Sequence, residues 1–215
     1  MCGVKFHKIN REQILIITLI ILYSVGLFGI LSPTWKDTIL PLSSINLTLS
    51  FLAILVTIQA PREKLIKFLC IAFLIGWISE WVGVNTAYLF GVYHYDVNLG
   101  TKIFGVPIVI GLNWATLTVG ASYWAFRLSK QRFIRIIIGA LIMVLFDILM
   151  EPVAIRNEYW TWENNYIPIF NYVSWFLVSL LLQGIYFYWI KESMNKVVGV
   201  LFILMSLFFI ILNLF

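Results

Sequence analysis

The chain has 215 residues, of which 61% are hydrophobic and only 12% are charged, and its formal net charge is +5. A soluble domain is about half apolar and about a quarter charged, so this composition excludes an ordinary soluble fold, a disordered chain and a coiled coil. Two cysteines and two histidines are too few for a disulfide framework or a metal cluster, and we expect no bound metal.

Seven stretches are long and apolar enough to cross a bilayer, which takes about 20 residues each. In chain order they are Ile14–Leu31, Ile39–Ala60, Leu65–Phe90, Ile103–Phe126, Phe133–Met150, Phe170–Ile190 and Val197–Phe215. Helices are favoured over an open sheet because unpaired backbone groups are costly in hydrocarbon. We therefore predict an all-α polytopic membrane bundle of about seven helices, with residues 1–215 forming a single transmembrane domain.

The basic residues predict how this bundle is oriented. With the N-terminus inside, twelve of the 15 lysines and arginines fall on the cytoplasmic side, and only Lys36, Lys102 and Arg156 fall outside. Cytoplasmic loops of membrane proteins carry such an excess of positive charge. We predict a cytoplasmic N-terminus in a multi-pass protein of the bacterial inner membrane. The basic residues then set the orientation of the helices and also attract anionic lipid. Nucleic acid is not an expected partner.

Two acidic residues, Glu80 and Asp147, fall inside predicted spans. A charged side chain at the bilayer centre costs about 2.5–3.5 kcal/mol on insertion scales, so such residues usually mark function. The alternative is a protonated carboxyl that only cross-links two helices. At about 1.5 Å per residue, Glu80 and Asp147 lie about 22 and 21 Å along their helices, at similar depth in the outer third of the bilayer. Glu151 shares a helix face with Asp147, and we expect Pro152 to end that helix.

Aromatic and small residues surround these acids in the sequence. Aromatic faces can stabilise a cation by about 0.5–2 kcal/mol, which suits a cationic intermediate, whereas Trp175 and Tyr172 are interpreted as interfacial anchors. Gly76 and Gly83 lie on the face of Glu80 and are expected to permit close packing, with room for a ligand as the alternative. The aromatic and amide residues that we select as candidates to support the acids are Asn85, Tyr93, Tyr95, Trp160, Trp162 and Asn171.

Two sequence blocks resemble a known family. The first is Ser79-Glu80-Trp81-Val82-Gly83-Val84-Asn85-Thr86, followed by Phe90-Gly91-x-Tyr93-x-Tyr95, Leu99-Gly100 and Gly105-Val106-Pro107; the second is Asp147-x-x-x-Glu151-Pro152-Val153-Ala154 with Trp160-x-Trp162 and Pro168-x-x-Asn171-Tyr172. Together they resemble the membrane carotenoid-biosynthesis family that includes carotenoid 1,2-hydratases of the bisanhydrobacterioruberin hydratase and γ-carotene 1'-hydroxylase types. The resemblance covers roughly residues 70–180, and Ala87 departs from the expected glycine.

The resemblance implies hydration of the terminal double bond of an acyclic carotenoid end, giving a tertiary alcohol without a cofactor. It also implies a carotenoid substrate in the bilayer, and an association with other enzymes of the pathway is possible. Our hypothesis is that Glu80, Asp147 and Glu151 surround the reacting end, with Asp147 preferred as the acid. The six aromatic and amide residues above would then position water or shield the cation. The alternatives are a carotenoid cyclase using the same protonation, a proton-coupled transporter and a structural scaffold.

Overall fold

The computed structural model describes residues 10–57, 62–190 and 195–215. Six stretches are helical, long and apolar enough to cross a membrane: α1 (Arg11–Leu31), the α2–α3 stretch Lys36–Thr57, α4 (Arg62–Thr86), α6 (Arg132–Arg156), α7 (Ile169–Trp189) and α8 (Lys196–Leu214). Within the second stretch, α2 (Lys36–Ile39) and the 3-10 turn η1 (Leu40–Leu42) precede α3 (Ser43–Thr57). The predicted all-α membrane-type fold is confirmed. Residues 58–60 of the second predicted span, and the basic residues Lys5, Lys8 and Lys191, lie outside the described residues.

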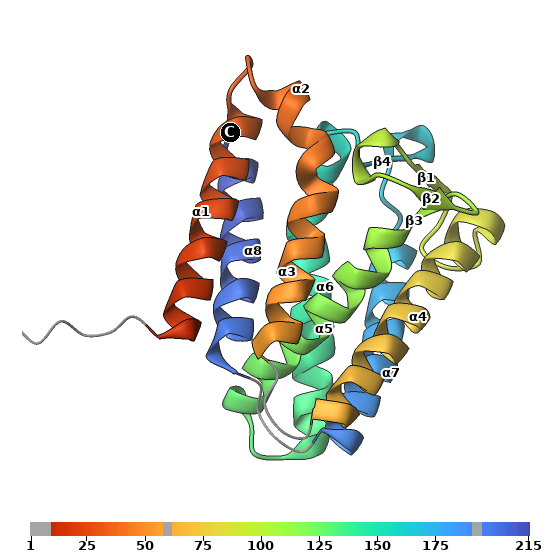
Figure 1. The fold of residues 1–215 in the computed structure, drawn as a ribbon. Coiled ribbons are helices and arrows are strands. Elements are labelled where there is room, and N and C mark those ends of the chain that lie inside the picture. The colour runs from red at the N-terminus through yellow and green to blue at the C-terminus, as the bar shows by residue number, and fades with distance from the viewer. Residues whose placement is uncertain (1–9, 58–61, 191–194) are drawn as a thin grey trace, which may run out of the picture.

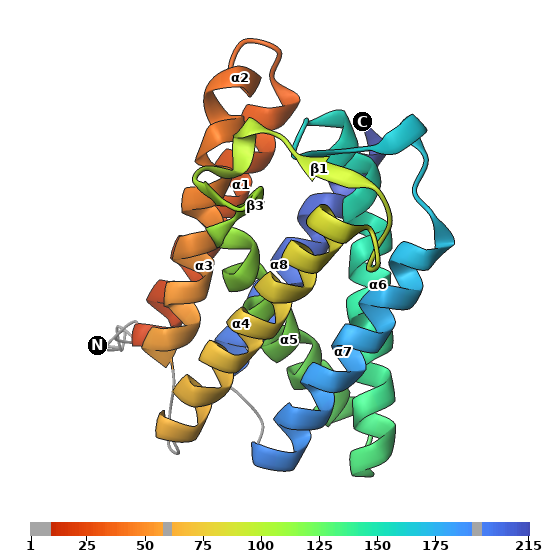
Figure 2. The same ribbon diagram turned by 90° about the vertical axis from the view of Figure 1, so that its right-hand side faces the viewer.

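A seventh long helix, α5 (Ile108–Leu128), lies in the middle of the bundle (Figures 1 and 2). Fifteen of its 21 residues are buried, and it contacts α3, α4, α6, α7 and α8. Because it faces other helices rather than lipid, it can carry polar groups that pair internally. For example, Ser122 Oγ donates a hydrogen bond to Gln183 Oε1 of α7 at 2.8 Å.

Helix α6 does not end at Pro152, as the sequence had led us to expect, but continues to Arg156. Proline removes one backbone donor, so the carbonyl four residues earlier loses its helical partner. Membrane helices tolerate this because neighbouring groups and local adjustments satisfy the freed carbonyl. The helix ends instead at Asn157, whose backbone N–H and side-chain Nδ2 both donate to Val153 O, at 3.1 and 2.8 Å. Asp147 and Glu151 therefore lie on a continuous helix.

Two short antiparallel ribbons cover one end of the bundle, next to the end of α4 (Figure 1). Strand β1 (Tyr93–Tyr95) pairs with β4 (Trp160–Trp162), and β2 (Lys102–Ile103) pairs with β3 (Val106–Pro107). The 3-10 turns η2 (Val97–Leu99) and η3 (Glu163–Asn165) follow β1 and β4. Since side chains alternate along a strand, the β1–β4 pair directs its four tyrosine and tryptophan rings to one buried face. These strands were not predicted from the sequence.

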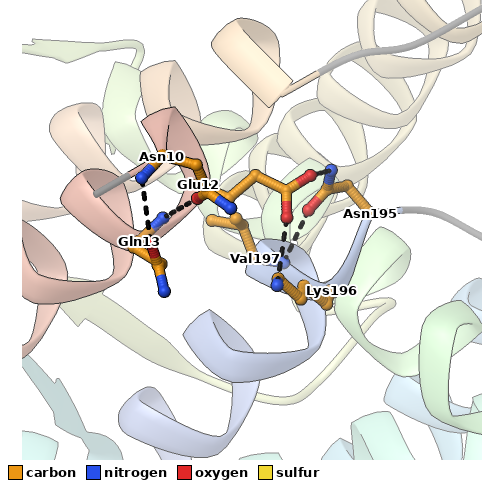
Figure 3. Close-up of polar contacts among 6 residues, drawn as sticks. All are labelled: Asn10, Glu12, Gln13, Asn195, Lys196 and Val197. Carbon is orange, nitrogen blue, oxygen red and sulfur yellow. Dashed lines mark hydrogen bonds and ion pairs between the residues drawn. The ribbon is translucent and has the colours of Figure 1, made fainter. Parts of the chain in front are cut away.

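At the other end of the bundle, polar contacts tie the start of α1 to the start of α8 (Figure 3). The Glu12 carboxylate accepts a hydrogen bond from Asn195 Nδ2 at 2.6 Å and pairs with Lys196 Nζ at 3.2 Å. Asn10 and Gln13 form a reciprocal capping box that begins α1, which satisfies backbone donors that a helix start leaves unpaired. Helix α1 is thereby held against α8 at this end.

Candidate active site

Helices α4, α5, α6 and α7 and the buried face of the β1–β4 ribbon enclose a small cavity. Its volume is about 30 Å³, and a water molecule needs about 10–15 Å³ by this measure, so there is room for one or two. The cavity is lined by Glu80, Phe90, Tyr93, Tyr95, Ile110, Asn113, Trp114, Asp147, Met150, Glu151, Trp160, Trp162, Asn171 and Trp175. This set contains every candidate residue from the sequence except Asn85, and no lysine, arginine or histidine.

Glu80 is held by three hydrogen-bond donors from two different elements. Tyr93 Oη and Tyr95 Oη of β1 donate to Glu80 Oε2 at 2.5 and 2.7 Å, and Trp114 Nε1 of α5 donates to Oε1 at 2.9 Å. The residue is only 4% exposed. An indole N–H can only donate, and both carboxyl oxygens are engaged. Glu80 therefore serves as the acceptor that organises one wall of the cavity.

Two glycines of α4 make this wall possible. A Cβ added at Gly76 would lie 2.3 Å from Trp114 Cβ, and one added at Gly83 would lie 2.8 Å from a ring carbon of Phe90 and 3.0 Å from Tyr93 Oη. Any side chain larger than hydrogen would thus displace the rings that contact Glu80. The prediction that both glycines permit close packing is confirmed.

Glu151 is held in a similar way by β4. Trp160 Nε1 and Trp162 Nε1 donate to Glu151 Oε2 at 3.0 and 2.8 Å. The strand places both indoles on the same side because they are two residues apart. Both indoles approach one carboxyl oxygen, so Oε1 is not engaged by them. Strand β1 thus supplies two donors to Glu80 on α4, and β4 supplies two donors to Glu151 on α6. The strand pairing holds these four rings together, because Tyr93 lies opposite Trp162 and Tyr95 lies opposite Trp160.

Asp147 is the least satisfied of the three acids. It is fully buried, at 0% exposure, and its Oδ2 accepts one hydrogen bond, from Asn171 Nδ2 of α7 at 2.7 Å. Its other oxygen, Oδ1, has no hydrogen-bond partner among the described residues, and neither has Oδ1 of Asn113, which lines the same cavity. Buried polar atoms normally have a partner, often an ordered water. Each of these two oxygens is therefore an acceptor that the described residues leave unpaired.

The two phenols that contact Glu80 lie outside the spanning helices. Burial raises the pKa of Tyr93 and of Tyr95 well above the ordinary value of 10.0, and the nearby negative charge of Glu80 raises both pKa values further. A phenol with a raised pKa keeps its proton at neutral pH. Both tyrosines therefore act as hydrogen-bond donors under physiological conditions.

Some residues lie elsewhere than expected. Asn85 is exposed and lies outside the cavity, where its Nδ2 donates to Trp81 O at 2.9 Å and to Phe104 O at 3.1 Å, which ties the end of α4 to the β2–β3 turn. Trp175 is not an interfacial anchor: it is 5% exposed and stacks on Trp114 at a centroid distance of 4.0 Å. Trp114 was not recognised in the sequence, where a tryptophan within an apolar stretch carries no distinctive signal.

These features define an integral membrane protein with a buried acidic site enclosed by aromatic donors. Residues 41–215 match the family described as carotenoid biosynthesis protein, and the chain belongs to this family. The chain is also similar to bisanhydrobacterioruberin hydratase of Haloarcula japonica, with 28% identity over 114 residues, which covers 48% of this chain and 39% of that relative. The chain thus spans about two fifths of the relative's length. No solved structure shows significant similarity to it.

Proposed function

We propose that the protein is a carotenoid hydratase that adds water to the terminal double bond of an acyclic carotenoid end, giving a tertiary 1-hydroxy group. The observation that carries the proposal is the unpartnered, buried Oδ1 of Asp147, a residue that lines a cavity of water size. Family membership supports a carotenoid as the substrate class. The name of the relative, a hydratase, supports the addition of water.

The arrangement of donors suggests different roles for the three carboxyls. Three ionised carboxylates in one cavity without a neighbouring cation would repel each other strongly, so at least one proton is held among them. Donors occupy both oxygens of Glu80 and one oxygen of Glu151. The unpartnered oxygen of Asp147 is the position that can carry a proton and present it to a substrate. We therefore assign Asp147 as the general acid.

The proposed reaction then proceeds in two steps, protonation of the alkene and capture of the cation by water. Asp147 gives its proton to the terminal alkene, which forms a new C–H bond and leaves a tertiary cation on the adjacent carbon. The water bound near Asn113 attacks this cation through its oxygen, and Glu151 Oε1 accepts the proton that the water releases. Glu151 lies one helical turn after Asp147, so the proton can return to Asp147 through the next water molecule. The net reaction is the addition of one water to one double bond.

The aromatic wall has a separate role in this proposal. The rings of Tyr95 and Trp160 pack edge to face at 5.9 Å, and Tyr93 and Trp162 lie 4.9 Å apart. Aromatic faces stabilise nearby cations by about 0.5–2 kcal/mol each, and they also exclude bulk water from the intermediate. Glu80 fixes the tyrosines and contributes negative charge beside the cation.

Cyclisation is the nearest alternative, because the same cation could be captured by an internal double bond. The unpartnered acceptor Asn113 Oδ1 favours hydration, since it would bind the attacking water. Expression in a bacterial host that accumulates lycopene separates the two reactions. The expected product is heavier than lycopene by one or two waters. An isomer of unchanged mass would indicate cyclisation, and unchanged lycopene would refute both reactions.

The proposed location is the bacterial cell membrane, with the cavity toward its outer face. Lys64, Lys67 and Arg132 gather around one hollow at the starts of α4 and α6. The β1–β4 ribbon lies toward the opposite ends of these helices (Figure 1), and its tyrosines and tryptophans line the cavity. Because positive loops remain in the cytoplasm, the acidic cavity would lie near the extracytoplasmic side. Labelling of exposed loop cysteines from each side of the membrane would test this orientation.

A further inference from the structure

The acidic cavity is too small for the substrate proposed above, but it lies next to further space in the bundle. A second chamber of about 60 Å³ adjoins it, and Ile110, Asn113, Met150 and Trp160 line both spaces. The remaining lining of this chamber is largely apolar and comes mostly from α1, α3 and α8, including Tyr23, Leu47 and Phe209, with Leu99 of η2 and Tyr159 before β4. The two spaces therefore share a boundary, and they differ in chemistry: one is acidic and the other is suited to hydrocarbon.

The chamber in turn adjoins a groove between α1 and α3. Ser43, Asn46 and Phe208 line both the chamber and this groove, whose volume is about 170 Å³. Large apolar side chains on its two helices are exposed, with Val25 of α1 at 56% and Ile45 of α3 at 54%. In a membrane such side chains face acyl chains. The three spaces thus widen from the acidic cavity toward the lipid.

The positions of α1 and α3 explain why a groove remains between them. Tyr23 Oη and Ser50 Oγ are joined by a hydrogen bond of 2.9 Å, and the Tyr23 ring packs edge to face on Phe208 at 5.8 Å. Beyond Tyr23, the helix presents Gly26, where an added Cβ would meet only Phe208, at 3.6 Å. The absence of a side chain at Gly26 leaves the groove open next to the chamber.

We propose that this chain of spaces is the binding path for the isoprenoid chain of the substrate, which enters sideways from the bilayer between α1 and α3. The terminal double bond would reach the boundary at Asn113, and the remaining polyene would lie through the chamber and the groove into lipid. The apolar lining offers this hydrocarbon chain favourable burial at about 25 cal/mol per Å². This inference rests on the proposed function for the identity of the substrate, although the path itself serves any reaction at the acidic cavity.

Gly26→Phe tests the path because its side chain would extend toward Phe208 and fill the groove. Gly184→Phe on α7 is the matched control, since nothing lies within 4 Å of a Cβ at Gly184 and this residue lines none of the three spaces. We would measure both the lycopene retained per purified protein and the lycopene converted in cells. Gly26→Phe should lower both by at least about tenfold through steric exclusion, whereas Gly184→Phe should change neither.

A second measurement does not depend on whether Gly26→Phe folds. In a chain whose cysteines Cys2 and Cys70 are replaced by serine, Ile45→Cys places a thiol in the groove. Leu52→Cys places one on the same helix, 45% exposed and outside the three spaces. Added lycopene should slow maleimide labelling at Ile45→Cys and leave Leu52→Cys unaffected.

The outcomes separate the path from the proposed reaction. If a folded Gly26→Phe binds and converts lycopene like the wild type, or if lycopene protects both cysteines equally, the path is refuted while hydration stands. If the wild type binds lycopene without forming a hydrate, and Gly26→Phe loses that binding, the path stands and the proposed function fails.

Discussion

Replacing Asp147 by asparagine is the most direct test of the proposed acid. The two side chains have the same shape, and the asparagine carbonyl can still accept the hydrogen bond that Asn171 Nδ2 donates at 2.7 Å. The amide nitrogen would then take the place of Oδ1. Because the proposed acid is protonated and neutral, one neutral hydrogen bond replaces another, and such a bond contributes about 1 kcal/mol. We therefore expect a folded, membrane-inserted protein.

The same replacement should nearly abolish activity, because an amide has no proton of suitable acidity to give to an alkene. General acid catalysis contributes about 10²–10⁴ in rate, which corresponds to about 3–5.5 kcal/mol in the activation barrier. Purified Asp147→Asn in detergent, supplied with lycopene, should form hydrated product at least about a hundredfold more slowly. Asp37→Asn, an exposed position on α2, is the matched control. If Asp147→Asn retains more than about a tenth of the wild-type rate, Asp147 is not the general acid.

Three further predictions concern the wall of the cavity. Gly76→Ala should lower the unfolding free energy by about 1–3 kcal/mol through overpacking, since its Cβ would lie 2.3 Å from Trp114. An unchanged midpoint of thermal unfolding in detergent would contradict this close packing. Trp162→Phe removes the indole N–H that donates to Glu151 at 2.8 Å and should reduce kcat more than it raises KM. A raised KM with an unchanged kcat would instead assign Trp162 to substrate binding alone. Because burial and the adjacent negative charge raise the pKa of Tyr93 above 10.0, the stabilisation from its protonated form is complete below about pH 10 and decreases above it. Alkaline difference absorbance between the wild type and Tyr93→Phe should show no phenolate from Tyr93 at pH 10, where an exposed phenol is about half ionised. A phenolate signal from Tyr93 at that pH would refute the burial of this donor.

Much of the architecture could be predicted from the sequence, because lipid imposes simple requirements. Apolar runs of spanning length predicted the helices, and the described ends of α1, α4, α7 and α8 lie within a few residues of the predicted ends. The cost of a carboxyl in hydrocarbon singled out Glu80 and Asp147. Helical spacing placed Glu151 on the same face as Asp147. These inferences depend only on local sequence and on the solvent.

Only the tertiary structure decided which groups meet the acids. Trp114 and Trp175 reach the cavity from α5 and α7, and no local pattern distinguishes a tryptophan that binds a carboxylate from one that anchors a helix. The pairing of β1 with β4 joins segments more than sixty residues apart, and it places the tyrosines and tryptophans on one face. Asn85 shared a sequence block with Glu80, yet the turn of its helix directs it to Phe104 O instead. The sequence thus determined which residues are costly to bury, whereas long-range packing determined the partners that make their burial possible.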